Sequence, residues 1–151
     1  RVEAMGAVDE LNTLLGAVLV HSLPAAITAL LTDVQHALFD IGGEMAIPGA
    51  KTVNAGYVTR LEQALDAYNE DLPMLKEFIL PGGGGAAVAA HVARAVCRRA
   101  ERRVMSLSRV ESINGHSQRY LNRLSDLLFV LARVLAVGGD GEVFWDATRN
   151  R

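Results

Sequence analysis

The sequence predicts an all-α fold, a five-helix bundle that forms one domain over residues 1–151. Five stretches carry apolar residues at helical spacing, and no stretch alternates apolar and polar residues as a half-buried strand does. Proline, glycine and polar residues break the pattern between these stretches, and the connections are short. Hydrophobic residues make up 50% of the chain, which suits a single domain with one sizeable core.

The first three helices are predicted over residues 2–20, 25–47 and 57–68. Each of them carries an apolar stripe along one face. Pro24 can open the second helix, and Pro48 followed by Gly49 ends it. The third helix is shorter and follows a polar connection.

Residues 72–80 are expected to be irregular or extended, and they lead to Pro81 and four glycines at 82–85. Glycines before a helix could cradle a phosphate on the backbone N–H groups of the first turn. The run lacks the Gly-Lys-Ser/Thr sequence of a P-loop, which excludes that motif. A flexible start to the following helix is the preferred interpretation.

The fourth predicted helix, residues 86–107, carries a cluster of arginines. It is rich in Ala and has no Pro or Gly inside it. Five arginines lie between Arg94 and Arg103, with Glu101 as the only acid among them. At about 100° per residue, the side opposite the apolar stripe holds Arg94, Arg98 and Glu101, with Arg102 at its margin and with Arg99 and Arg103 on a third strip.

Clustering of one sign of charge favours an anionic partner, because Arg binds phosphate and carboxylate groups through a planar fork of donors. The whole chain has a formal net charge of -2, which favours a small anionic ligand over a long nucleic acid. The alternative, and the commoner case for a run of charge, is a solvated face or a set of arginines salt-bridged to acids of other helices.

The fifth helix is predicted over residues 118–137, after a polar loop at 108–117. The sequence Gly-Gly-Asp-Gly at 138–141 ends it, and the tail beyond is expected to be loosely held. Asn122 and Asp126 lie one turn apart on this helix, so both could reach polar atoms of one ligand. A polar stripe that faces water explains them equally well.

Four other side chains are candidates for chemistry. Asp9 is the acid best placed to pair with an arginine, although an isolated Asp is more often a surface residue. Phe78, taken alone, is expected to be a core anchor. Asp33 and His36 have the three-residue spacing of a di-iron bundle, but the matching Glu set is missing and no metal site is predicted.

The single cysteine, Cys97, leaves no disulfide within the chain and no Cys-based metal site. No signal peptide and no apolar run long enough to span a bilayer can be found. We therefore expect a cytoplasmic protein without a membrane partner. The chain begins with Arg1 inside a helical pattern, and a native N-terminal segment is expected ahead of it.

Four segments, in this order along the chain, resemble the PduO-type ATP:cob(I)alamin adenosyltransferases. They are VEAMGAVDELN at 2–12, LFDIGGE at 38–44, FILPGG at 78–83 with ARAVCRRAERRV at 93–104, and YLNRLSDLLF at 120–129. The resemblance implies a five-helix bundle that assembles as a homotrimer, with active sites between subunits. It also implies the reaction, in which Co(I) of reduced cobalamin attacks the 5′ carbon of ATP and triphosphate leaves.

The resemblance implies roles for particular residues as well. Arg98 and Phe78 would be catalytic, and Phe78 would occupy the space below the corrin with Phe129 near it. Asp9 and Arg94 would form a salt bridge across the subunit interface. The ATP-site and interface motif would comprise Arg94, Arg98, Glu101, Arg102, Asn122 and Asp126.

The resemblance also implies substrates, partners and missing segments. ATP, Mg²⁺ and cobalamin are the expected small molecules. A reductase and an adenosylcobalamin-dependent acceptor enzyme are the expected protein partners, and nucleic acid is not. In the family a Thr-, Gly- and Asp-rich segment ahead of the position of Arg1 wraps the ATP phosphates. The alternatives are a non-catalytic trimeric module that binds an anionic partner through its arginine helix, and a structural trimer that has lost activity.

Overall fold

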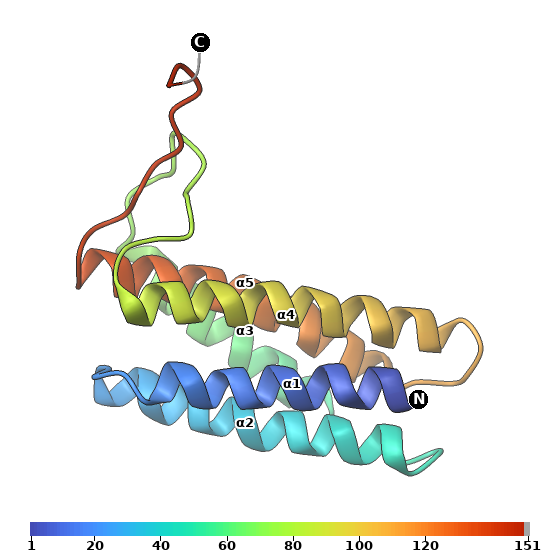
Figure 1. The fold of residues 1–151 in the computed structure, drawn as a ribbon. Coiled ribbons are helices and arrows are strands. Elements are labelled where there is room, and N and C mark those ends of the chain that lie inside the picture. The colour runs from blue at the N-terminus through green and yellow to red at the C-terminus, as the bar shows by residue number, and fades with distance from the viewer. Residues whose placement is uncertain (150–151) are drawn as a thin grey trace.

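Five helices lie side by side in the bundle that the apolar stripes predict (Figure 1). This computed structural model describes residues 1–149, and within that range one isolated β-bridge is the only strand-like pairing. Going across the bundle, α2 packs on α1, α1 on α4, α4 on α5, and α5 on α3. The all-α prediction is confirmed. The helices are α1 (Val2–Leu19), α2 (Ala25–Ala46), α3 (Ala55–Glu70), α4 (Gly85–Ser108) and α5 (Gly115–Val137).

The core is built from the predicted stripes, and α5 contributes the largest share of it. Leu121, Leu124, Leu128 and Leu131 of α5 are completely buried or nearly so. Because α5 is packed against both α3 and α4, its position is fixed from two sides. The polar faces of α4 and α5 are therefore displayed on a rigid support. No helix within residues 1–149 is both long and apolar enough to cross a membrane.

Two helices begin earlier than the apolar stripes predict, because an asparagine caps each of them. The Asn54 side chain accepts a hydrogen bond from the backbone N–H of Gly56 at 2.9 Å, and α3 begins at Ala55. The Asn114 side chain accepts from the N–H of His116 at 3.0 Å, so residues 115–117 are helical and not part of a loop. Asn is among the best N-cap residues, since its side-chain oxygen replaces a missing acceptor in the first turn.

A buried carboxylate joins the end of α2 to the start of α5. Glu44 accepts hydrogen bonds from the backbone N–H groups of Thr52 at 2.5 Å and Val53 at 2.7 Å. It also accepts from the Asn114 side chain at 2.9 Å and from the Ser117 hydroxyl at 2.5 Å. A buried charge with this many donors is well compensated. Glu44 therefore serves the fold.

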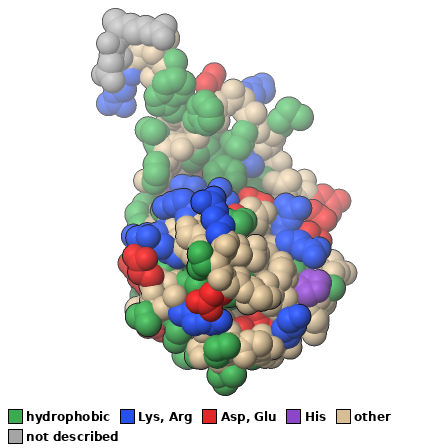
Figure 2. All heavy atoms as spheres, turned by 90° about the vertical axis from the view of Figure 1, so that its right-hand side faces the viewer, with side chains coloured by type: hydrophobic (Ala, Val, Ile, Leu, Met, Phe, Trp, Pro, Cys, Tyr) green, Lys and Arg blue, Asp and Glu red, His purple; other side chains and the backbone are tan. Residues whose placement is uncertain are grey.

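Two segments far apart in the sequence rise together from one end of the bundle, residues 71–84 and 138–149 (Figure 1). We call this pair of segments the arm. The backbone N–H of Leu80 donates to the carbonyl of Val143 at 2.8 Å, and the backbone N–H of Trp145 donates to the carbonyl of Phe78 at 2.8 Å. The prediction of a loosely held tail is wrong for residues 141–145, whereas residues 146–149 are exposed and hydrogen-bond to one another. Hydrophobic side chains cover much of the arm (Figure 2).

The glycines that precede α4 allow the two segments of the arm to approach closely at the base. Gly83 has φ of 91°, and a Cβ added there would overlap the Ala136 side chain of α5. A Cβ on Gly82 would lie 2.9 Å from a methyl group of Val143. Only glycine adopts such a φ readily and lacks the clashing atom. The glycine run at 82–85 therefore allows close packing, in addition to forming the flexible helix start that the sequence predicts.

An ion pair buried at the base fixes the arm to α5. Arg133 donates from Nε to Glu142 at 2.6 Å and from Nη2 to the carbonyl of Pro73 at 2.7 Å. Both side chains of the ion pair are 5% exposed. Arg133 therefore holds one residue from each segment of the arm.

Candidate functional site

A hollow of about 540 Å³ opens on the polar faces of α3, α4 and α5. Arg94 and Arg98 line it from α4, and Arg123, Asp126 and Phe129 line it from α5. We call it the arginine hollow. The structure thus brings four residues of the predicted site to one place, from segments about 30 residues apart in sequence.

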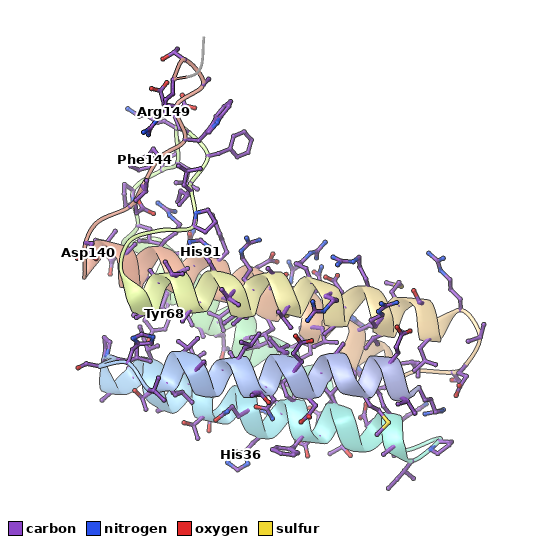
Figure 3. All side chains as sticks on the ribbon, viewed as in Figure 1. His36, Tyr68, His91, Asp140, Phe144 and Arg149 are labelled. Carbon is purple, nitrogen blue, oxygen red and sulfur yellow. The ribbon has the colours of Figure 1, made fainter. Side chains whose placement is uncertain are left out.

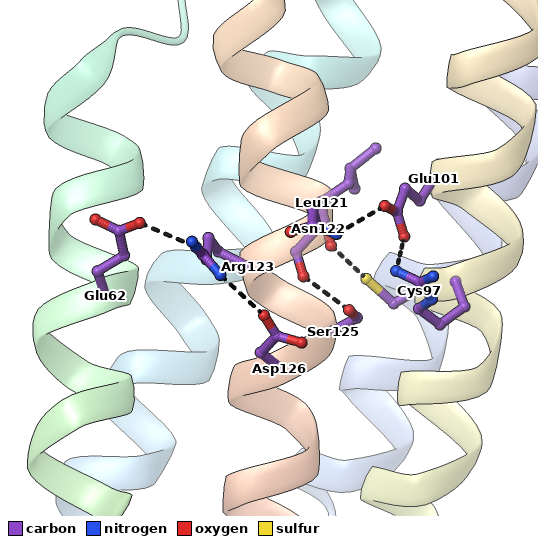
Figure 4. A network of polar contacts seen from close by, with 9 residues as sticks. Glu62, Cys97, Glu101, Leu121, Asn122, Arg123, Ser125 and Asp126 are labelled. Atoms are coloured by element: carbon purple, nitrogen blue, oxygen red, sulfur yellow. Dashed lines mark hydrogen bonds and ion pairs between the residues drawn. The ribbon is translucent and has the colours of Figure 1, made fainter.

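Glu101 and Asn122 fix the position of Arg98, which lines the arginine hollow. Figure 4 shows the contact between Glu101 and Asn122. One carboxylate oxygen of Glu101 pairs with Arg98, and the other accepts from the Asn122 amide at 2.9 Å. The Arg98 side chain remains 47% exposed. A guanidinium has five N–H donors, and the carboxylate uses one of them here. Arg98 is therefore oriented by a carboxylate while several donors remain available to an anion.

Asp126 is paired inside the arginine hollow and is not a solitary acid. Arg123 donates from Nε to Glu62 of α3 at 2.9 Å and from Nη1 to Asp126 at 3.3 Å (Figure 4). These two hydrogen bonds raise the pKa of Arg123. The charged side chains that line the hollow are three arginines, Arg94, Arg98 and Arg123, and one acid, Asp126, so the lining carries a net positive charge.

Arg94 has a buried donor without an acceptor among the described residues. Its Nε is inaccessible and makes no hydrogen bond. A buried N–H left unsatisfied costs about 1–3 kcal/mol. An acceptor from another molecule, either a ligand or a second copy of the chain, would remove this cost.

A second hollow, of about 490 Å³, adjoins the first at the base of the arm and shares Arg94 and Phe129 with it. We call it the arm hollow. Phe78, Pro81 and His91 also line it. The Phe78 side chain is 77% exposed, so the expectation of a core anchor is wrong.

His91 is a site residue that the sequence analysis missed. It is 4% exposed, lies with its ring edge-on to Phe129 at 6.3 Å, and has no partner for Nδ1 among the described residues. Burial, with Arg94 close by, lowers the pKa of His91, so the ring is neutral near pH 7. Figure 3 shows it near the base of the arm. The sequence could have indicated His91 as a site residue, because it precedes Arg94 by three residues and so lies on the same side of the helix.

The remaining arginines of α4 divide into two groups. Arg99 pairs with Glu10, and Arg103 pairs with Glu3 at 3.1 Å, so α1 supplies both acids. For these two arginines the alternative of salt bridges to another helix is correct. Viewed from the end of the bundle, basic and acidic side chains are interspersed (Figure 2). Arg102 is exposed and lines neither the arginine hollow nor the arm hollow.

Asp9 lies on another face of the molecule. It lines hollows between α1 and α2 together with Asn12 and Phe39, whereas Arg94 faces α5 and the arm. Among the described residues Asp9 has no ion pair. The two residues therefore do not meet within one chain.

Asp33 and His36 line a hollow of about 370 Å³ with Tyr57, whose hydroxyl donates to Asp40 at 2.9 Å. Figure 3 shows His36 on the side of the bundle away from the arm. Within residues 1–149 no group of three or more His, Cys, Asp or Glu side chains is placed to hold a metal ion.

Cys97 is buried between α4 and α5, where its thiol contacts the carbonyl of Leu121 at 3.2 Å (Figure 4). Burial raises the pKa of the Cys97 thiol, so the group stays protonated. A protonated, inaccessible thiol has no nucleophilic role.

Comparison with known proteins gives consistent matches over nearly the whole chain. The family model described as cobalamin adenosyltransferase matches residues 1–135. A cobalamin adenosyltransferase of Cupriavidus metallidurans is 50% identical over 151 residues, which is 99% of this chain and 82% of that protein. A corrinoid adenosyltransferase of Bacillus subtilis is 44% identical over 154 residues, covering 97% of this chain and 80% of that protein.

Solved structures agree with these matches. A variant of a PduO-type adenosyltransferase from Lactobacillus reuteri, complexed with ATP, superposes with a TM-score of 0.91 at 36% identity, covering 97% of this chain and 87% of that chain. A second variant of the same enzyme, complexed with cobalamin and ATP, gives a TM-score of 0.89 at 34% identity, covering 97% of this chain and 84% of that chain.

Proposed function

The chain belongs to the cobalamin adenosyltransferase family and is a corrinoid adenosyltransferase, and we propose that it binds its two substrates at the adjoining arginine and arm hollows. The enzyme transfers the 5′-deoxyadenosyl group of ATP to cobalt. The Co(I) electron pair forms the Co–C bond as the C5′–O bond breaks, and triphosphate leaves with the electrons of that bond. The products are adenosylcobalamin and triphosphate.

The arginine hollow is the proposed site of the ATP phosphates. The leaving triphosphate gains charge in the transition state, and cationic donors fixed in advance stabilise that charge. Arg98 is the catalytic residue of this set, since Glu101 and Asn122 hold it in place while several donors stay available. Arg102 lies outside the hollow, and its role depends on the family motif alone. The full proposed set is Arg94, Arg98, Glu101, Arg102, Asn122 and Asp126.

The arm hollow is the proposed site of the corrin. Phe78 is exposed there and Phe129 lies beside Arg94, so apolar rings and a cation adjoin. A bulky ring below the corrin keeps water and the lower axial base away from cobalt. Loss of that ligand destabilises Co(II) relative to Co(I), which is a way to tune a metal cofactor. No side chain is needed to activate Co(I), which is already a strong nucleophile.

A homotrimer with active sites between subunits explains the separation of Asp9 from Arg94. The buried Nε of Arg94 needs an acceptor, and Asp9 lies exposed on a different face. We propose that Asp9 of one subunit pairs with Arg94 of the next. Exchanging the charges in the double variant Asp9→Arg with Arg94→Asp should restore the assembly that either single change weakens, as measured by light scattering. Trimers in both single variants would overturn the pairing.

Mg²⁺ fits as a companion of ATP. Mg²⁺ is usually held by phosphate oxygens with one or two carboxylates, so a cage of acids is not required. Asp126 lines the arginine hollow, and Glu62 and Glu101 pair with arginines that line it, so all three carboxylates are already paired with arginine. We therefore propose that Mg²⁺ arrives bound to the triphosphate. A cytoplasmic location, a reductase that supplies the reduced substrate and an acceptor enzyme for the product complete the proposal.

The observation that carries this assignment is the joining of a cationic hollow to an aromatic one at Arg94 and Phe129. The test supplies the full-length protein with ATP, Mg²⁺ and reduced cobalamin and follows the corrin absorption spectrum. Arg98→Ala should lower kcat/KM for ATP about tenfold or more, because charge-assisted hydrogen bonds contribute about 1.5–3 kcal/mol. Arg103→Ala is the matched control, since Arg103 pairs with α1, and it should leave ATP use unchanged.

Phe78→Ala should impair Co(II) reduction more than ATP binding. No spectral change with the wild-type protein, together with salt-dependent binding to polyanions, would instead support the non-catalytic module. Unaltered turnover in both Arg98→Ala and Phe78→Ala would overturn the assignment of the two hollows.

A further inference from the structure

Phe78 lies on the arm, where the backbone belongs to no helix and the ring is 77% exposed. An exposed ring on such a segment can occupy several rotamers, and the proposed role of Phe78 requires one position. The contact that restrains it comes from the other segment of the arm. The backbone N–H of Trp145 donates to the Phe78 carbonyl at 2.8 Å. The two rings meet edge to face, with centroids 6.0 Å apart and an interplanar angle of 65°.

Trp145 is itself fixed to the bundle. The hydrogen bond from Leu80 to Val143 and the bridge between Ile79 and Phe144 hold the two segments together beside it. Below them, the buried pair of Arg133 and Glu142 attaches the arm to α5. The backbone at Trp145 therefore has a defined position, and from it the Trp145 ring meets the Phe78 ring.

We propose that Trp145 is a positioning residue that holds the Phe78 ring in the place where it meets the lower face of the corrin. This inference rests on the proposed function, because it assigns the cause of the Phe78 position and not a new reaction. Edge-to-face aromatic pairs contribute about 0.5–1.5 kcal/mol beyond the area they bury, which corresponds to about a two- to tenfold change in the population of the paired rotamer. That factor is the size of the effect expected on Co(II) reduction.

Phe144 provides a matched control on the same segment. It is 49% exposed and Trp145 is 45% exposed, so truncation of either removes a comparable aromatic surface. Successive residues of an extended segment point to opposite sides, so the Phe144 ring and the Trp145 ring cannot both face Phe78. The edge-to-face pair that the structure has on the described arm joins Phe78 to Trp145.

The experiment compares the full-length wild-type protein with Trp145→Ala, Trp145→Leu, Trp145→Phe and Phe144→Ala. It measures the fraction of four-coordinate Co(II), the form without a lower axial ligand, by electron paramagnetic resonance at saturating ATP and cobalamin. It also measures kcat and KM for each substrate. Trp145→Ala and Trp145→Leu should lower the four-coordinate fraction and kcat about two- to tenfold, with KM for ATP unchanged. Trp145→Phe should restore most of both, and Phe144→Ala should behave as wild type.

A double variant tests whether the effect passes through Phe78. If it does, adding Trp145→Ala to Phe78→Ala should cause no further loss, because coupled residues are not additive. Equal losses in Trp145→Ala and Phe144→Ala, full four-coordinate Co(II) in Trp145→Leu, or an effect confined to KM for cobalamin would overturn the positioning role. Failure of the proposed function looks different, since the wild type would then form no adenosylcobalamin and Phe78→Ala would change nothing.

Discussion

The buried ion pair at the base of the arm allows a quantitative prediction. Glu142→Gln keeps the shape of the side chain but leaves the Arg133 guanidinium buried without its counter-charge, with the Pro73 carbonyl as a remaining acceptor. Removing one partner of a buried pair typically costs about 3–5 kcal/mol. With a urea m-value of about 1–3 kcal/mol/M, a loss of about 3 kcal/mol lowers the midpoint of unfolding by about 1–3 M.

The sole tryptophan makes the assay specific to the arm, because Trp145 is the chain's only Trp and lies on it. Urea unfolding followed by Trp fluorescence reports the arm, and far-ultraviolet ellipticity reports the helices. In Glu142→Gln the fluorescence midpoint should fall further than the ellipticity midpoint, because the arm detaches first. The control is Glu62→Gln, which removes an exposed partner of Arg123 and should leave both midpoints unchanged. An unchanged fluorescence midpoint in Glu142→Gln would refute the anchoring role.

Three further outcomes can be measured on the fold. Burial lowers the pKa of His91 below its ordinary value of 6.5, so the unfolded chain binds more protons than the folded chain at acidic pH, and the free energy of unfolding falls as pH drops below about 6.5. His91→Leu should reduce the difference between the urea midpoints measured at about pH 8 and at about pH 5. Gly83→Ala should cost more than about 1 kcal/mol in thermal unfolding because of its positive φ and its close packing, whereas Gly42→Ala, in open space inside α2, should add about 0.5–1 kcal/mol. Asn54→Ala should cost about 0.5–2 kcal/mol in urea unfolding, and Asn54→Asp should retain the cap, because the Asn54 side chain only accepts from Gly56. Equal losses in both variants would contradict the capping role.

The order and lengths of the helices could be predicted because each has an apolar stripe several turns long. The stripe through Leu121, Leu124 and Leu128 is an example, since it fixes both the helix and its buried face. The starts of α3 and α5 were missed by two or three residues. In each case an asparagine, Asn54 or Asn114, caps the helix and extends it over residues that carry no periodic signal.

The division of the arginines on α4 was only partly predictable. Helical geometry placed Arg99 and Arg103 on a separate strip from Arg98, which agrees with their pairing to α1. It could not show that Glu101 would orient Arg98 by also accepting from Asn122, because that contact depends on how α4 packs against α5. Periodicity describes one helix at a time, and the site forms where three helices meet.

The arm is the part that sequence patterns could not predict, for a physical reason. Its pairing joins Phe78 to Trp145 across the whole of α4 and α5, through one β-bridge and two backbone hydrogen bonds. A pairing this short leaves no alternation to detect. What holds it is the close packing of Gly83 and the buried charge of Arg133, both of which depend on the folded bundle. The bundle must therefore form before the position of Phe78 is defined, so variants that loosen the arm should impair catalysis while leaving the helices intact.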